Sequence, residues 1–241
     1  NSMKNKKQID YNLSFKGKTV LVTGASRGIG FKISEDFKYL GAKVIGLSSK
    51  DYDLSSDYEL TKFINYIKKI KKIDILVNNA GVNFSEENKN FSINKYEKLM
   101  NVNLKAPFLI TQAVTKKMIK YKYGRIINIS SILSERVRVG KSAYSSSKFG
   151  LVGFTKTLSV ELAKYNILVN SISPGLIETE MTKSMLTKQQ IKKFRKEIPL
   201  KRLGKTEDVS SAVIYLSSDI NQFITGHNLV VDGGLLSYLN V

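Results

Sequence analysis

The stretch Thr19-Val-Leu-Val-Thr23-Gly24-Ala-Ser-Arg27-Gly28-Ile-Gly30 decides the fold. Its apolar first half is typical of a buried strand, and its glycines stand where that strand turns directly into a helix. Glycine permits a tight turn and lets the backbone approach a pyrophosphate, which the N–H groups and dipole of the following helix can bind. A glycine triplet also occurs in plain strand–helix connections, so the rest of the chain must decide its meaning.

Short apolar runs alternate with longer amphipathic segments along the whole chain. The runs predict strands at 19–23, 43–47, 73–77, 125–129, 167–172 and 228–231. Apolar residues at helical spacing predict helices at about 28–40, 56–71, 93–121, 142–164 and 206–218. This alternation indicates a parallel sheet with helices on both faces. We therefore expect a single α/β domain, a Rossmann-type doubly wound sheet of about seven strands, with a dinucleotide site at the glycine turn.

The composition excludes several classes of site. The 241 residues contain no cysteine, which excludes disulfides and thiolate metal sites and favours a cytoplasmic location. The single histidine, His227, leaves no room for a histidine-rich metal centre, and no apolar run is long enough to cross a bilayer. We expect neither a metal site nor a membrane partner. Residues 1–14 are expected to be an N-terminal extension that starts with a cloning remnant before Met3, and residues 15–241 to form the domain.

The formal net charge of +19 raises the question of nucleic-acid binding. Only six of the 39 basic residues are arginine, and the lysines are spread along the chain rather than clustered among aromatic residues. A phosphate-binding surface uses arginine and clustered charge more often, so the pattern favours a solvated lysine coat. We expect no nucleic-acid partner, although such a surface could favour an acidic protein or an anionic substrate.

Tyr144 and Lys148 stand four residues apart within the predicted helix 142–164, so the phenol and the ammonium share one helix face. A free tyrosine has a pKa near ~10, and a fixed neighbouring cation lowers that pKa toward the range of acid–base catalysis. In a chain rich in lysine this pair alone is weak evidence, and its weight depends on the other motifs.

Together the motifs resemble those of the short-chain dehydrogenases/reductases, in that family's order and spacing from about residue 15 onward. The resemblance rests on the glycine turn, Asn78-Asn-Ala-Gly81, Asn103, Ser131 placed 13 residues before Tyr144, Tyr144 with Lys148, and Pro174-Gly175. It implies an NAD(P)-dependent oxidoreductase that transfers hydride between a nicotinamide and a carbonyl or secondary alcohol. Within the family the chain is most similar to the 3-oxoacyl-[acyl-carrier-protein] reductases, through Arg27, the segment 124–131 and the ending Val231-Asp-Gly-Gly234.

The resemblance also implies a role for each of four residues. Tyr144 would be the general acid, Lys148 would lower its pKa and hold the nicotinamide ribose, and Ser131 would bind the substrate oxygen. Asn103 would hold a water that links Lys148 to solvent. The competing interpretations are a strand-end cap for Ser131, a helix-bending polar residue for Asn103 and an ordinary core aromatic for Tyr144. The intact set of four argues against a catalytically silent dinucleotide-binding protein.

For the cofactor, the resemblance implies contacts across the first half of the chain and at the end of the fifth predicted strand. These residues are Gly24, Ser26, Arg27, Gly28, Ile29, Gly30, Ser48, Ser49, Asp53, Leu54, Asn79, Ala80, Gly81, Tyr144, Lys148, Pro174, Gly175, Ile177 and Thr179. NAD-preferring members carry an acidic residue after the second strand, where this chain has Leu47-Ser-Ser-Lys50, so Arg27 and the serines favour NADP. Asp51 follows at once and keeps NAD as the alternative. We expect the helix that usually separates the second and third strands to be nearly absent, and Asp53-Leu54 to contact adenine across a shortened connection.

The substrate is the open question. The charged loop 133–141 holds Arg136 and Arg138, which predict contact with an anionic substrate such as a sugar acid, a nucleotide-linked sugar or a phosphopantetheine arm; a solvated or subunit-interface loop is the competing interpretation. The alternative to an acyl reductase is therefore a dehydrogenase of an anionic sugar or another small polar hydroxy or keto compound. Residues 176–205 are expected to form a substrate lid.

Three further expectations concern partners. Lys122, and Tyr165 with Lys164, match positions where the acyl reductases hold their acidic carrier protein at the mouth of the site. The helices at 93–121 and 142–164 are expected to build a homotetramer or a homodimer. His227 is expected to be structural or interfacial rather than catalytic.

Overall fold

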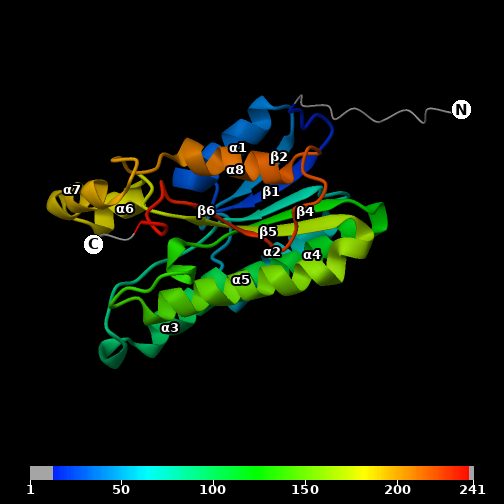
Figure 1. Ribbon diagram of the computed structural model, residues 1–241. Coiled ribbons are helices and arrows are strands. Elements are labelled where there is room, and N and C mark those ends of the chain that lie inside the picture. Colours follow the sequence, from blue (N-terminus) through cyan, green and yellow to red (C-terminus); the bar gives the residue numbers. More distant parts are fainter. Residues whose placement is uncertain (1–12, 239–241) are drawn as a thin grey trace, which may run out of the picture.

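A six-stranded parallel sheet organises the chain in the computed structural model, which describes residues 13–238 (Figure 1). The strand order is β2-β1-β3-β4-β5-β6, and every neighbouring pair is parallel. The strands are β1 (Thr19–Thr23), β2 (Lys43–Leu47), β3 (Ile75–Asn78), β4 (Gly124–Ile129), β5 (Ile167–Pro174) and β6 (Asn228–Val231). The direction of winding reverses between β1 and β3, and in such sheets ligands bind where the strands on either side of this point end.

The expectation of about seven strands is wrong by one: residues 13–238 form six, all of them at the positions that the apolar runs predict. The expectation that the helix between the second and third strands is nearly absent is also wrong, since α2 (Asp57–Lys69) fills that place. Only nine residues, 48–56, connect β2 to this helix. They are folded into turns in which Ser48 donates to Asp51 and Ser55 donates to Asp53. A parallel strand needs a crossover of a dozen residues or more, so this connection has no room for a further helix and strand. As a result β2 is an edge strand.

The helices form two layers, one on each face of the sheet (Figure 1). α1 (Gly28–Tyr39) and α8 (Thr206–Ser217) pack on one face, and α2, α4 (Ala106–Tyr121) and α5 (Ser142–Leu162) pack on the other. Successive residues of a strand face opposite sides, so in β1 Val20 and Val22 belong to the core under α1 and α8, whereas Leu21 belongs to the core under α2 and α4. Each such fully buried side chain stabilises the fold by about 1.5–3 kcal/mol. No helix within residues 13–238 combines the length and apolar character that a bilayer crossing needs.

The predicted helix 93–121 is interrupted in its middle. α3 (Ile93–Met100) passes through a π-helical turn, η2 (Asn101–Lys105), into α4. A π turn holds one extra residue and often marks a functional site. Here it contains the fully buried Asn103, whose side chain hydrogen-bonds outside the helix. Apolar periodicity alone does not reveal such a turn, because the helical pattern resumes after it.

Two helices, α6 (Glu180–Met185) and α7 (Lys188–Glu197), fill most of the predicted lid. A parallel bridge between Ile177 and Gly204 closes the base of this segment. Thr187 and Gln190 form a reciprocal capping box at the start of α7, a sequence signal for a helix that the polar composition of the segment obscures. The remaining short elements are the 3-10 turns η1 (Asn88–Asn90), η3 (Ile132–Ser134) and η4 (Ala163–Tyr165).

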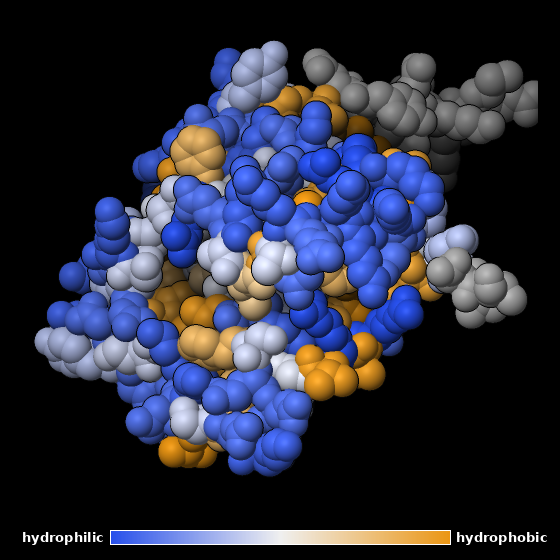
Figure 2. Space-filling view, turned by 90° about the vertical axis from the view of Figure 1, so that its left-hand side faces the viewer, coloured by the Kyte–Doolittle hydropathy of each residue, from blue (hydrophilic) through white to orange (hydrophobic). Residues whose placement is uncertain are grey.

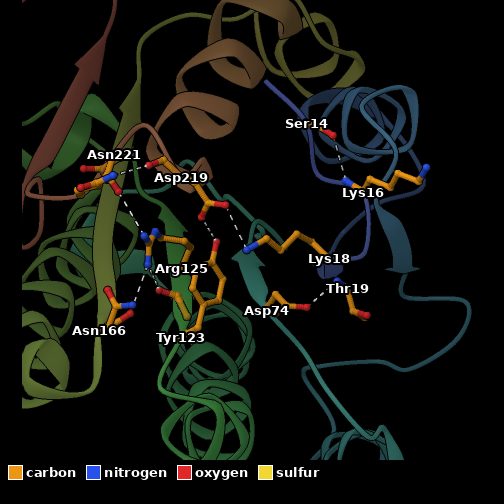
Figure 3. A network of polar contacts seen from close by, with 12 residues as sticks. Ser14, Lys16, Lys18, Thr19, Asp74, Tyr123, Arg125, Asn166, Asp219 and Asn221 are labelled. Carbon is orange, nitrogen blue, oxygen red and sulfur yellow. Dashed lines mark hydrogen bonds and ion pairs between the residues drawn. The ribbon is translucent and has the colours of Figure 1, made fainter. Parts of the chain in front are cut away.

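A polar network holds the amino-terminal edge of the sheet together (Figure 3). Arg125, at the start of β4 and 3% exposed, donates to the carbonyl oxygens of Gly124, Asn166 and Asn221. Its guanidinium also lies 4.7 Å from the ring centroid of Tyr123. These contacts join β4 to the residue before β5 and to the loop after α8. The opposite, carboxyl-terminal edge of the sheet is where the cleft lies.

Candidate active site

A cleft of about 880 Å³ opens at the carboxyl ends of the central strands. Its wall includes Thr23 at the end of β1, Asn79 after β3, Ser131 after β4 and Gly175 after β5. Figure 2 shows a hollow on the side that carries the lid, with hydrophobic side chains inside and hydrophilic ones around it. The volume is that of a typical small-molecule site, roughly 300–1,000 Å³.

The structure brings nearly all of the predicted site residues to this one cleft. Every predicted cofactor, catalytic and substrate residue lines it except Gly30 and Asn103. Gly30 instead packs directly against the carbonyl of Gly24 and the amide of Asn79, where a Cβ atom has no room. It therefore sets the close approach of α1 to the strands rather than touching the cleft.

The glycine turn has the form that a phosphate group needs. Gly24 and Gly28 have φ values of +68° and +56°, a region in which a side chain is strained. The Asn79 amide donates to the carbonyl oxygens of Thr23 and Gly24, which fixes the turn against β3. The residue before α1, Arg27, gives its helix no side-chain cap. The first N–H groups of α1 are thus left for an anion, so the residues present fit a dinucleotide.

Asn103 acts as a clamp on the loop after β3. Its Oδ1 accepts from the N–H of Val82 at 2.9 Å, and its Nδ2 donates to the carbonyl of Val82 at 2.9 Å and to Ser147 Oγ at 3.2 Å. These bonds explain the π turn, because an ordinary α turn would carry the side chain away from Val82. The water link between Asn103 and Lys148 stays a prediction.

Tyr144 and Lys148 lie on the first turns of α5, as their spacing predicts, with the ammonium 5.7 Å from the centre of the phenol ring. Lys148 is 4% exposed and donates to the carbonyl of Ile129 at 2.9 Å. Ser131 lies between the end of β4 and η3, where its hydroxyl accepts from the N–H of Leu133. A hydrogen bond with Ser131 also acts on the phenol of Tyr144. The three side chains therefore share one end of the cleft.

The expectation that Lys148 lowers the pKa of Tyr144 is not met in this structure. Burial raises the pKa of Tyr144 to about 12, and the hydrogen bond with Ser131 lowers it by less than burial raises it. Burial also lowers the pKa of Lys148 to about 8. Desolvation disfavours the charged form of both groups, so it raises the pKa of the phenol and lowers the pKa of the ammonium. The phenol is protonated at neutral pH, which is the form that a general acid requires.

Comparisons with known proteins agree with this geometry. A family model described as enoyl-(acyl carrier protein) reductase matches residues 46–236. The chain is 38% identical over 246 residues to the 3-oxoacyl-[acyl-carrier-protein] reductase FabG of Aquifex aeolicus, across 92% of this chain and 99% of the relative. It belongs to the short-chain dehydrogenase/reductase family.

Two further members of this family are informative. The Rickettsia typhi reductase of the same name is 40% identical over 239 residues, across 93% of this chain and 99% of that protein. The crystal structure of a gluconate 5-dehydrogenase from Burkholderia cenocepacia, in complex with NADP and tartrate, superposes with a TM-score of 0.87 at 28% identity. It covers 95% of this chain and 98% of its own. The chain is accordingly an NAD(P)-dependent oxidoreductase.

At the end of β2, where members of the family differ in cofactor choice, Asp51 folds back over Ser48. Its carboxylate accepts from the N–H and the hydroxyl of Ser48, both at 2.8 Å, and these bonds lower the pKa of Asp51. Asp51 does not line the cleft, whereas Ser48 and Arg27 do. Arg27 also makes a long, exposed ion pair of 3.5 Å with Glu180 at the start of α6.

The sequence does not single out two groups of residues that line the cleft. One is Lys141, the residue just before α5, which is 4% exposed. The only signal for it is its place three residues before Tyr144, one helical turn away. The other group is apolar and comes from the lid and the chain end: Met181, Met185, Leu186, Phe194, Leu235 and Leu236.

The expected carrier-binding positions do not lie at the mouth of the cleft in this chain. Lys122 ends α4 in a left-handed conformation just before β4, and Lys164 and Tyr165 lie just before β5. The cleft is at the other end of these strands, and the six residues of β4 span about 20 Å. His227 likewise lines no part of the cleft; its backbone pairs with Asn170 and Ser171 at the entry to β6.

Proposed function

We propose that this protein reduces the 3-oxo group of an acyl thioester presented on acyl carrier protein, with NADPH as the hydride donor. The observation that carries the proposal is the convergence of Ser131, Tyr144 and Lys148 at one end of a cleft whose other end has a glycine turn at the start of α1. Relatives named as 3-oxoacyl-[acyl-carrier-protein] reductases, at 38% and 40% identity over nearly their full length, support the choice of substrate.

The residues divide the reaction between them. The hydroxyl groups of Ser131 and Tyr144 hold the carbonyl oxygen, so that negative charge develops on an atom that already has two donors. Tyr144 gives its phenolic proton to that oxygen, and its raised pKa keeps the proton available at neutral pH. The nicotinamide supplies the hydride when it is bound. Lys148 contacts the ribose with its ammonium, which the carbonyl of Ile129 already orients.

NADP is favoured over NAD by the cleft near β2. Arg27, Ser48 and Ser49 line this part of the cleft, and Arg27 provides a guanidinium for a 2′-phosphate. The nearby acid, Asp51, is held by Ser48 and does not line the wall. The gluconate 5-dehydrogenase from Burkholderia cenocepacia was crystallised with NADP, which supports the same choice.

The lid, residues 176–205, is proposed to close over the substrate. Met185, Leu186 and Phe194 give its helices an apolar side toward the cleft, and closure over a bound acyl group would exclude water from the reacting carbonyl. The bridge between Ile177 and Gly204 would stay fixed as the base of this movement.

A second candidate function is oxidation of an anionic sugar or a similar hydroxy acid. It is favoured by the basic side chains of the loop before α5, which line the cleft, and by the similarity to a gluconate 5-dehydrogenase. The two functions differ in substrate, not in the residues that carry out hydride transfer.

The assembly is proposed to be a homodimer or homotetramer that uses the outer faces of α4 and α5. Phe108 and Phe149 are about half exposed, and Val160 is 79% exposed. The ring centroids of Phe108 in α4 and Phe154 in α5 lie 5.2 Å apart. Exposed apolar side chains that gather on two adjacent helices are typical of an interface. The cytoplasmic location stays a prediction.

The direct test is a substrate and cofactor panel with the purified protein. NADPH and NADH oxidation would be followed with an acetoacetyl thioester, and NADP reduction with gluconate. We expect NADPH oxidation with the thioester to have the highest kcat/KM. A higher kcat/KM for gluconate oxidation would replace the proposed function by the second candidate, and a preference for NADH would overturn the cofactor choice.

A further inference from the structure

Lys141 is a buried cation without a carboxylate partner. It is 4% exposed, and its ammonium donates to two neutral oxygens, Asn83 Oδ1 at 2.8 Å and the carbonyl of Phe84 at 3.1 Å. None of the ion pairs formed within residues 13–238 includes it. An ammonium has three N–H donors, so one is left without an acceptor in this part of the chain. Removing an ammonium from water without a counter-ion costs free energy, so the buried position of Lys141 is unfavourable unless an anion joins it.

The backbone around Lys141 fixes the ammonium in place. Its N–H donates to the carbonyl of Arg138, which closes a turn, and Gly140 occupies the left-handed region of that turn at φ +76°. The carbonyl of Gly140 accepts from the N–H of Glu86, which ties this turn to the loop that supplies Asn83 and Phe84. A lysine held from two sides in this way is prepared for a ligand rather than free to reach solvent.

Two further basic side chains lie near Lys141 and add to the positive potential of this part of the cleft. Arg136 and Arg138 line the same cleft, and Arg138 lies over the ring of Phe194 in α7, at 5.9 Å. Three acids also line the cleft, and two of them already have partners within the chain. Asp53 accepts a hydrogen bond from the hydroxyl of Ser55, and Glu180 forms an ion pair with Arg27. The third, Glu197, is the last residue of α7 and belongs to none of the ion pairs formed within residues 13–238.

We propose that Lys141 binds the carboxylate of a short oxo or hydroxy acid, so that the catalytic residues that serve the thioester also turn over free short-chain acids. The proposal rests on the proposed reductase chemistry and adds a substrate class to it. The reaction balances as an oxo acid, NADPH and a proton giving a hydroxy acid and NADP. The hydride goes to the carbonyl carbon, the proton of Tyr144 goes to its oxygen, and the carboxylate is unchanged.

The distance between the two groups limits the size of the acid. The ammonium of Lys141 lies 6.0 Å from the ring centroid of Tyr144. The phenol oxygen lies one ring radius and one C–O bond from that centroid, so only a few C–C bonds, of about 1.5 Å each, fit between an anion on Lys141 and a carbonyl on Tyr144. The phosphate of a carrier arm is separated from the thioester by a much longer chain, so it cannot reach Lys141 while the 3-oxo group meets Tyr144. A carboxylate one to three carbons from the carbonyl fits.

A set of matched substrates tests this. Pyruvate, acetoacetate and levulinate place the carboxylate progressively farther from the carbonyl, and their methyl esters keep the carbonyl but remove the charge. We expect the wild-type protein to have a higher kcat/KM for at least one acid than for its ester. Lys141→Gln, which can still donate to Asn83 and Phe84, should lower kcat/KM for that acid about 10- to 100-fold, as expected for loss of a charged hydrogen bond. The ester should change less than about threefold.

Two control variants separate a specific role from a structural one. Lys141→Arg keeps the positive charge and should retain more activity with the acid than Lys141→Gln. Lys122→Gln removes an exposed lysine from the far edge of the sheet and should leave both substrates unchanged. Equal losses for acid and ester in Lys141→Gln would show that Lys141 only supports the fold, and the proposal would be overturned.

A binding measurement keeps this test independent of turnover. Calorimetry would follow acetoacetate, the probe, as it binds to the protein saturated with NADP, in the wild type and in Lys141→Gln. Binding that weakens at least tenfold in the variant supports the proposal. Wild-type protein that reduces the thioester but neither binds nor reduces any of the three acids would overturn it, while the proposed function would stand. Absence of thioester reduction together with acid binding through Lys141 would overturn the proposed function alone.

Discussion

At the residue scale, burial acts on three titratable side chains at the same end of the cleft. It raises the pKa of Tyr144 to about 12 and lowers the pKa values of Lys141 and Lys148 to about 8 each. Each neutral form is favoured because the low-dielectric surroundings penalise charge. The result is a phenol that holds its proton and two lysines that lose theirs just above neutral pH.

The lowered pKa of Lys141 predicts that KM depends on pH for substrates that carry a carboxylate. Above about pH 8 Lys141 becomes neutral and no longer attracts a carboxylate, so KM for acetoacetate should rise between pH 7 and pH 9.5. The positive charge of Arg138 also lowers this pKa. The measurement is the ratio of the KM values for acetoacetate and methyl acetoacetate. Titration of Lys148 affects both substrates, so its effect cancels in this ratio. In Lys141→Arg the ratio should be flat, and a flat ratio in the wild type would contradict the assignment.

The sequence predicts some of these residues and not others for a physical reason. Tyr144 and Lys148 lie on a helix, where a spacing of four residues determines a shared face, and Ser131 follows a strand whose apolar run marks its end. Lys141 lies in a turn that depends on Gly140 and on a bond to Glu86 more than fifty residues earlier. The burial of its ammonium results from that tertiary contact. The predicted direction of the Tyr144 pKa shift is wrong, because a helix spacing says nothing about desolvation.

At the element scale, regular strands and helices follow the apolar pattern, and the exceptions have local causes. β1, β2 and β6 have the predicted bounds, since buried parallel strands are continuous apolar runs between turns. The predicted helix 93–121 is divided because the side chain of Asn103 bonds to Val82 instead of to its own helix. The lid contains two helices that its polar sequence conceals, since none of their residues is fully buried.

We expect the buried guanidinium of Arg125 to stabilise the amino-terminal edge of the sheet. Arg125→Met keeps much of the side-chain volume but removes the donors to three carbonyl oxygens. Loss of these bonds from a buried site should lower the free energy of unfolding by about 2–4 kcal/mol. Urea unfolding followed by circular dichroism measures this. Lys122→Met, at an exposed position on the same edge, is the control and should change the free energy of unfolding by less than about 0.5 kcal/mol. Equal stability of the two variants would show that Arg125 does not hold this edge.

At the scale of the whole molecule, charge and exposed apolar surface point to different partners. The net charge of +19 gives the chain a field that attracts acidic macromolecules, a property that salt screens. Lys122 and Lys164 lie at the far edge of the sheet, about 20 Å from the cleft along β4. A carrier protein whose acyl group occupies this cleft could contact these lysines in two ways. Either the carrier spans that distance, or a second subunit supplies the lysines.

The proposed interface on α4 and α5 can be tested by one substitution. Phe149→Glu places a charge on the outer face of α5, where the phenyl ring is 46% exposed. Burial of that charge in an interface is unfavourable, so the variant should shift to a smaller assembly in analytical ultracentrifugation. Tyr39→Glu, at an 89% exposed aromatic position on α1, should leave the assembly unchanged. A wild-type protein that sediments as a monomer, or a shift caused equally by both variants, would rule out this interface.

The central claim is that the phenol of Tyr144 gives its proton to a carbonyl that receives hydride in this cleft. The measurement is kcat/KM for NADPH oxidation with an acetoacetyl thioester, in the wild type and in Tyr144→Phe, with the affinity for NADPH followed by its fluorescence. We predict that kcat/KM falls at least about 100-fold, since loss of a general acid typically costs a factor of about 10² to 10⁴, while NADPH affinity changes less than about threefold. Comparable turnover by the two proteins would contradict the account.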